Sequence, residues 1–207
     1  MRVSDDRYSR DRLRLDLALR FIRHEARTHT IRAWTGLTDD RIRKLYRTYL
    51  HEAGNERVAR HRGKSPQQAA FFLRAPRMQM ESAVLASMYC MMRVLPRTPH
   101  REFARTLPCV ARGELLCHAY DAYRTVIPDG RITFEHAVFL VTALATGDEL
   151  LLERCECCGA LTVTDRFAMQ APRCRQCVSD PGAGPLLQER AMPAGARGTP
   201  APAQLRR

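Results

Sequence analysis

The sequence predicts a mainly α-helical protein that ends in a small four-cysteine module. Apolar residues recur at three- and four-residue steps through most of residues 5–145, which is typical of amphipathic helices. Two Cys-x-x-Cys pairs follow, Cys155 with Cys158 and Cys174 with Cys177, and fifteen residues separate them. At 207 residues the chain corresponds to one domain of ordinary size, or to one domain with a small appendage.

The N-terminal part predicts three helices. The first spans residues 5–29 and places Leu13 on its apolar face. A short helix over residues 30–35 ends at Gly36. Thr38 is a suitable N-cap for a third helix that runs to about residue 51.

The middle of the chain predicts a longer helix after a basic, turn-rich stretch. Pro76 begins this helix, which extends to about residue 94. Its apolar stripe consists of Met80, Val84, Met88 and Met91. A methionine-rich stripe of this kind is more often core than a partner-binding groove, so we interpret it as core.

Shorter elements complete the predicted body. Helices are expected near residues 101–107, 109–126 and 133–145. Residues 148–153 are interpreted as one or two final helical turns, and residues 161–164 as the only convincing strand. The picture is a helical body with a small module at its end.

The cysteine spacing predicts a structural zinc site. A two-residue gap lets both thiolates of a pair face one ion, and two such pairs complete a tetrahedron. We therefore expect one structural Zn²⁺ per chain, held by Cys155, Cys158, Cys174 and Cys177. The neighbouring Cys157 competes for the first pair, but the two-residue spacing makes it a bystander.

Two other readings of the cysteines are less favoured. Disulfides suit secreted proteins, whereas the charged start of this chain lacks the apolar core of a secretory segment. A redox Cys-x-x-Cys usually follows a strand of an α/β pattern, which the sequence does not have. No apolar stretch is long enough to span a bilayer, so we expect a cytoplasmic protein without membrane contact.

The charge of the chain suggests an anionic partner. Its formal net charge is +12, and residues 1–64 hold 17 basic and 9 acidic residues. Such an excess most often accompanies nucleic acid. Arginine supplies 32 of the 34 basic residues, a ratio that a GC-rich genome explains as well as function does. The expected divisions are a basic N-terminal segment with a helix-turn-helix-like motif (1–64), a helical core (65–154), a zinc-binding module (155–178) and a disordered tail (179–207).

Residues 30–49 have the layout of a helix-turn-helix, in which the second helix enters the major groove of DNA. A helical hairpin with a solvated charged face fits the same pattern. The buried side of the second helix would consist of Ile42, Leu45 and Tyr49. The candidate DNA-binding residues on its exposed side are Arg41, Arg43, Lys44 and Arg47.

An enzyme is not expected. His100-Arg101-Glu102 and the second cysteine pair resemble parts of a zinc-deaminase signature, but Pro172 does not adjoin Cys174 as that signature requires. No Gly-rich phosphate loop and no hydrolase or metalloprotease motif occurs in the sequence.

Several segments resemble the FlhC family of flagellar transcriptional activators. They are Thr35-Gly36-Leu37-Thr38, Arg41-Ile42-Arg43-Lys44-Leu45-Tyr46, the stretch from Arg62 to Pro66 that leads into Phe71-Phe72, and Cys155-Glu156-Cys157-Cys158-Gly159 with its later pair. The resemblance covers about residues 10–180. It implies a cytoplasmic protein that joins FlhD in a hetero-oligomer, binds promoter double-stranded DNA and activates flagellar operons with RNA polymerase. It also implies that the two cysteine pairs bind zinc. The alternative is a zinc-stapled adaptor that binds protein without direct DNA contact.

Overall fold

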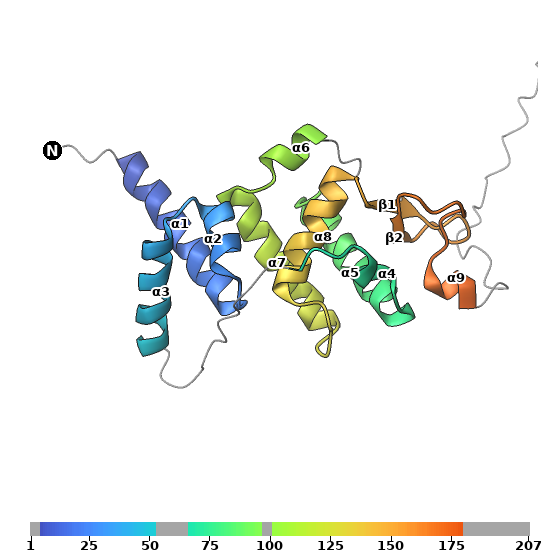
Figure 1. The fold of residues 1–207 in the computed structure, drawn as a ribbon, viewed down its shortest axis with the longest axis horizontal. Helices are drawn as coiled ribbons and strands as arrows, with labels where there is room; N and C mark the ends of the chain where they lie inside the picture. Colours follow the sequence, from blue (N-terminus) through green and yellow to red (C-terminus); the bar gives the residue numbers. More distant parts are fainter. Residues whose placement is uncertain (1–4, 53–65, 97–100, 180–207) are drawn as a thin grey trace, which may run out of the picture.

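The computed structural model describes residues 5–52, 66–96 and 101–179 (Figure 1). It is mainly helical, with one two-stranded antiparallel sheet in these ranges. Helices α1, α2 and α3 form one end of the elongated molecule, and strands β1 and β2 with the short helix α9 form the other. Between them lie α4 to α8. The basic, turn-rich stretch that precedes Pro76 in the sequence and the predicted tail fall largely outside the described residues.

The N-terminal group consists of three helices packed around aromatic and branched side chains. Their bounds are Asp5–Arg23 for α1, Thr28–Thr35 for α2 and Asp39–Glu52 for α3. Gly36 closes α2 with a φ of 70°, a left-handed conformation that glycine adopts without strain. The backbone N–H of Arg41 donates to the Thr38 side chain, so Thr38 caps α3 as predicted.

Helix α1 differs from its prediction in length and in its buried face. It ends at Arg23 because Glu25 adopts a φ of 59° and turns the chain toward α2. Leu17 and Phe21 are fully buried, but Leu13 is 54% exposed. The apolar face of α1 therefore contacts the protein only along its C-terminal half.

The central body contains five helices. Their bounds are Ala70–Leu73 for α4, Pro76–Met91 for α5, Arg101–Thr106 for α6, Val110–Val126 for α7 and Phe134–Thr146 for α8. Pro76 begins α5, and the Thr133 side chain caps α8 by accepting from the His136 backbone N–H. Phe21 of α1 meets Phe134 of α8 edge-to-face at 4.9 Å, which joins the N-terminal group to this body in one core.

The methionine stripe of α5 belongs to the core only in part, which corrects our interpretation. Met80 and Met91 are 48% and 67% exposed, whereas Val84 and Met88 are half-buried and pack against the core. The buried face of α5 instead includes Met78, Leu85 and Tyr89, together with the polar residues Glu81 and Ser82. Glu81 is compatible with burial because it accepts hydrogen bonds from the Arg77 and Tyr123 side chains and from the Arg131 backbone.

The C-terminal end is a β-hairpin followed by one turn of helix. Strand β1 spans Leu150–Arg154 and pairs antiparallel with β2, Leu161–Asp165, so that Leu152 lies opposite Val163. The prediction of helix over residues 148–153 is thus wrong, because the predicted strand needs a partner and residues 150–154 supply it. Helix α9 spans Arg175–Ser179. None of the helices in the described ranges has both the length and the apolar character needed to cross a lipid bilayer.

Candidate metal centre and basic helix face

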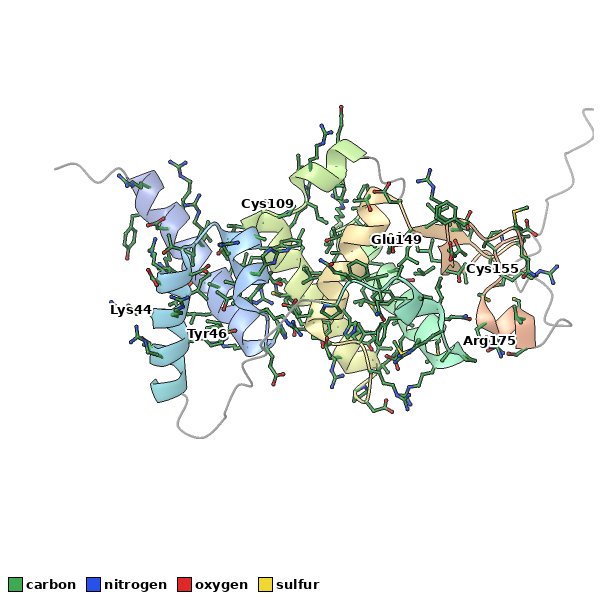
Figure 2. The ribbon with its side chains drawn as sticks, in the orientation of Figure 1. Lys44, Tyr46, Cys109, Glu149, Cys155 and Arg175 are labelled. Atoms are coloured by element: carbon green, nitrogen blue, oxygen red, sulfur yellow. The ribbon has the colours of Figure 1, made fainter. Side chains whose placement is uncertain are left out.

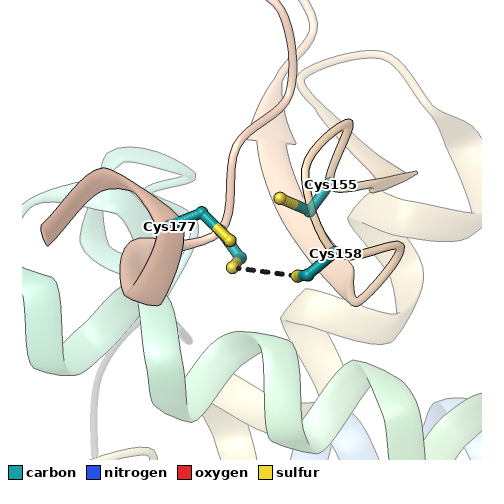
Figure 3. Close-up of side chains that lie close together, drawn as sticks. Cys155, Cys158 and Cys177 are labelled. Atoms are coloured by element: carbon teal, nitrogen blue, oxygen red, sulfur yellow. Dashed lines mark hydrogen bonds between the residues drawn. The ribbon is translucent and has the colours of Figure 1, made fainter. Parts of the chain in front are cut away.

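The first cysteine pair lies in the tight turn that joins β1 to β2. The Cys155 backbone N–H donates to the Ala160 carbonyl, and the Gly159 N–H donates to the Cys155 carbonyl, both at 2.8 Å. Gly159 has a φ of 73°, which is the left-handed conformation that the turn requires. This local geometry brings Cys155 and Cys158 to the same side of the hairpin tip (Figure 3).

The second pair lies at the start of α9. Cys174 precedes the helix and Cys177 lies within it, and the Val178 N–H donates to the Cys174 carbonyl at 3.1 Å. A hydrogen bond of 3.0 Å from the Glu156 N–H to the Pro172 carbonyl ties the two halves of the module together. Cys174 and Cys177 therefore both face the hairpin tip.

The four sulfurs form a cluster that can hold a metal ion. The Sγ atoms of Cys155, Cys158, Cys174 and Cys177 all lie within 4.8 Å of one another. The Cys158 and Cys174 sulfurs are 3.5 Å apart, far longer than the roughly 2 Å of a disulfide. With zinc–sulfur bonds of about 2.3 Å, a regular tetrahedron has edges of about 3.8 Å, so the arrangement fits such an ion.

The thiols of the cluster have unequal acidity. Burial alone would raise the pKa of Cys155. Hydrogen bonds from the backbone N–H groups of Cys174, Cys158 and Cys157 outweigh this effect and lower the pKa to about 6. The pKa of Cys177 is raised by burial and by the neighbouring sulfurs of Cys158 and Cys174. Adjacent thiolates repel one another, and a divalent cation reverses this effect because it stabilises every deprotonated sulfur around it.

Cys157 lies outside the sulfur cluster, as the spacing predicted. Its backbone N–H nevertheless supports the Cys155 sulfur. The remaining cysteines of the described residues, Cys90, Cys109 and Cys117, form no disulfide and lie in the helical body. Burial raises the pKa of Cys117 to about 12, which makes it an inert core thiol.

The candidate DNA-binding residues all lie on the solvent side of α3. Arg41, Arg43, Lys44 and Arg47 are exposed. On the opposite side Ile42 is fully buried, and Tyr46 is buried with its hydroxyl donating to the Ala26 carbonyl. Figure 2 shows Lys44 on the outer side of α3 and Tyr46 on the inner side. Leu45 is only half-buried, and the Tyr49 side chain lies outside the described residues.

Two of the four cations on α3 already have acidic partners. Arg43 lies 3.0 Å from Asp40, and Arg41 lies 3.7 Å from Asp11 of α1. Among the side chains that the structure describes, which do not include those of residues 49–52, no carboxylate forms an ion pair with Lys44 or Arg47. Lys44 and Arg47 are therefore the α3 cations that we expect to interact most strongly with a polyanion.

Sequence reasoning gave a groove on the methionine stripe only as its less favoured alternative, and the structure has a groove there, beside the metal centre. It lies between α5 and the cysteine module, with Met80, Val84 and Met88 on one side and Leu161 and Arg175 on the other. The available signal was that α5 is apolar on two faces, only one of which could reach the core. Comparison of the chain with protein-family models and with curated proteins finds no match.

Proposed function

We propose that this protein is a DNA-binding transcriptional activator of flagellar operons, acting as a hetero-oligomer with FlhD and using a structural zinc site. The observation that carries the proposal is the basic solvent face of α3 opposite the buried residues Ile42 and Tyr46. Helices α2 and α3, joined at Gly36, would act as a helix-turn-helix with α3 in the major groove. The flagellar operons, the FlhD partner and RNA polymerase enter this proposal through the resemblance of the quoted segments to the FlhC family.

The charge on α3 suits a phosphate backbone. Arg43 and Lys44 precede Arg47 by four and three positions, so each of them is a neighbour of Arg47 on the helix surface. Each phosphate neutralised by such a cation lowers the slope of log K against log salt by about 0.9. We expect Lys44 and Arg47 to contribute most, and Arg43 less, because Asp40 already neutralises part of its charge.

Zinc is the ion that we propose for the cysteine cluster. Four thiolates in a closed shell favour Zn²⁺ or iron and leave no open position for water or substrate. The ion would join the hairpin tip to α9 and contribute no catalytic step. The Cys155, Cys158, Cys174 and Cys177 side chains would hold it, while the turn at Gly159 sets the direction of the first pair.

The test is fluorescence anisotropy of a labelled duplex that carries the region upstream of a flagellar operon, with FlhD from the same genome. Lys44→Ala and Arg47→Ala should each weaken binding and make the slope of log K against log salt less negative by about 1. Arg105→Ala, which removes an exposed arginine from α6, is the matched control and should leave both unchanged.

Two results would count against the proposal. If the duplex binds and both α3 variants behave like the wild type, α3 does not contact DNA. If no duplex binds specifically, with or without FlhD, the adaptor alternative is favoured instead.

A further inference from the structure

The groove between α5 and the cysteine module, the α5 groove, has an apolar floor on an exposed helix face. Met80, Val84 and Met88 are four residues apart and form one stripe along α5. Met80 is 48% exposed, and the other two side chains are half-buried. Unbranched methionines adapt their shape to different partners, which is why such side chains recur at peptide-binding surfaces.

The opposite wall of the α5 groove comes from the cysteine module. Residues 160–162 and 174–176 line it, and Leu161 contributes an apolar side chain. Cys174 belongs to this wall and to the sulfur cluster at once. The groove has a volume of about 790 Å³, within the roughly 300–1,000 Å³ range of ligand-binding pockets.

The charge around the α5 groove comes from two arginine side chains and from the sulfur cluster to which Cys174 belongs. Its charged lining residues are Arg77 and Arg175, and no acidic residue of the described chain lines it. Arg77 is held by Glu81 at 2.8 Å and by Asp129 at 2.6 Å. Arg175 is exposed and forms no ion pair with a described carboxylate. An apolar floor beside an available guanidinium suits a ligand with apolar side chains flanked by carboxylates.

We propose that the α5 groove binds an amphipathic helix of a partner protein, with its apolar face on Met80, Val84 and Met88 and an acidic residue at Arg175. A helix seated in a groove is recognised by side chains at positions i, i+3 or i+4, and i+7, which matches the length of the α5 stripe. The carboxylate contact selects acidic over basic helices. This interaction does not depend on DNA binding by α3.

The test uses the full-length chain and a displayed library of helical peptides, in which leucine is fixed along one face and the flanking positions vary. The peptides that it enriches should carry Asp or Glu beside the leucine face. In fluorescence anisotropy with such a peptide, Val84→Glu should weaken binding by about tenfold or more, since a charge would enter the apolar floor. Met91→Glu changes an exposed α5 methionine outside the groove and should have no effect.

Two further variants distinguish a loss of peptide binding from a loss of folding. If Val84→Glu impairs folding, Met80→Glu places the same charge at an exposed position of the floor and should weaken the peptide equally. Arg175→Glu should disfavour the acidic peptide and favour its Lys-substituted counterpart, a reversal that a general loss of structure cannot produce.

Four outcomes would overturn the proposal. One is that no enriched peptide depends on the groove variants, and another is that the enriched flanks are neutral or basic. A third is reversible self-association that Met80→Glu abolishes, which would assign the groove to a second copy. The fourth is tighter peptide binding by Leu186→Ser or Leu187→Ser, which would assign it to the chain's own C-terminal segment. None of these assays contains DNA, so they succeed or fail independently of the α3 test.

Discussion

Replacing Glu81 with Gln tests how the central body is held together. The Glu81 carboxylate has no exposed surface. One oxygen accepts from Arg77 Nε at 2.8 Å, and the other accepts from the Tyr123 hydroxyl at 2.7 Å and the Arg131 backbone at 2.8 Å. Glutamine has almost the same shape, but one acceptor becomes an NH₂ donor that faces another donor.

The expected loss follows from these contacts. Hydrogen bonds to a charged group contribute about 1.5–3 kcal/mol and neutral ones about 1 kcal/mol. Weakening the two bonds from Tyr123 and Arg131 should therefore cost about 1–4 kcal/mol. For a protein of this size, each kcal/mol corresponds to about 2–4 °C in Tm. Differential scanning calorimetry and urea unfolding of Glu81→Gln should both show the loss.

The pH dependence of this effect has a definite sign. Burial raises the pKa of Glu81, but hydrogen bonds from Arg77, Tyr123 and Arg131 outweigh it and hold the pKa below its usual value. Its stabilisation is thus complete above the unfolded pKa and is lost as the pH falls through the folded pKa. The difference between wild type and Glu81→Gln should shrink in acid. Asp129→Asn, which removes an exposed carboxylate from the same Arg77, is the control and should leave Tm nearly unchanged. A Glu81→Gln protein as stable as wild type, or a difference that grows in acid, would refute the reasoning.

Two further predictions concern the ends of the molecule. Tyr46→Phe removes the hydroxyl that donates to the buried Ala26 carbonyl, so urea unfolding should show a decrease of about 1–2 kcal/mol in the free energy of unfolding. An unchanged urea midpoint would mean that this hydrogen bond does not stabilise the packing of α3. Cys174→Ser removes one sulfur of the cluster and should lower Tm and expose the hairpin to limited proteolysis, because metal binding and local folding are coupled. Cys157→Ser, a cysteine outside the cluster, should behave like wild type, and equal effects of the two serines would contradict the assigned ligand set.

The elements that sequence could predict are those whose signals are local. Gly36 and Thr38 mark the turn between α2 and α3 because a left-handed conformation and an N-cap depend on single residues. The cysteine cluster was predictable because a two-residue spacing restricts where both sulfurs of a pair can lie. In both cases the residue type alone limits the backbone geometry.

The errors arose where long-range contacts decide the structure. Residues 150–154 form a strand only because β2 lies beside them, and nothing in their own sequence marks the pairing. The buried face of α5 carries Glu81, a charged residue that sequence alone would assign to the surface. Its partners Tyr123 and Arg131 lie 42 and 50 positions away in the chain. The exposure of Met80 and Met91 was consequently not predicted.

Metal content measured on protein purified without chelator tests the central claim most directly. Mass spectrometric analysis of the wild type should find one zinc per chain, and the same value for Cys157→Ser. Cys155→Ser and Cys177→Ser should lose most of it, because each removes one sulfur from a cluster whose members all lie within 4.8 Å. A wild-type chain that carries no metal, or that carries iron in place of zinc, would contradict the account.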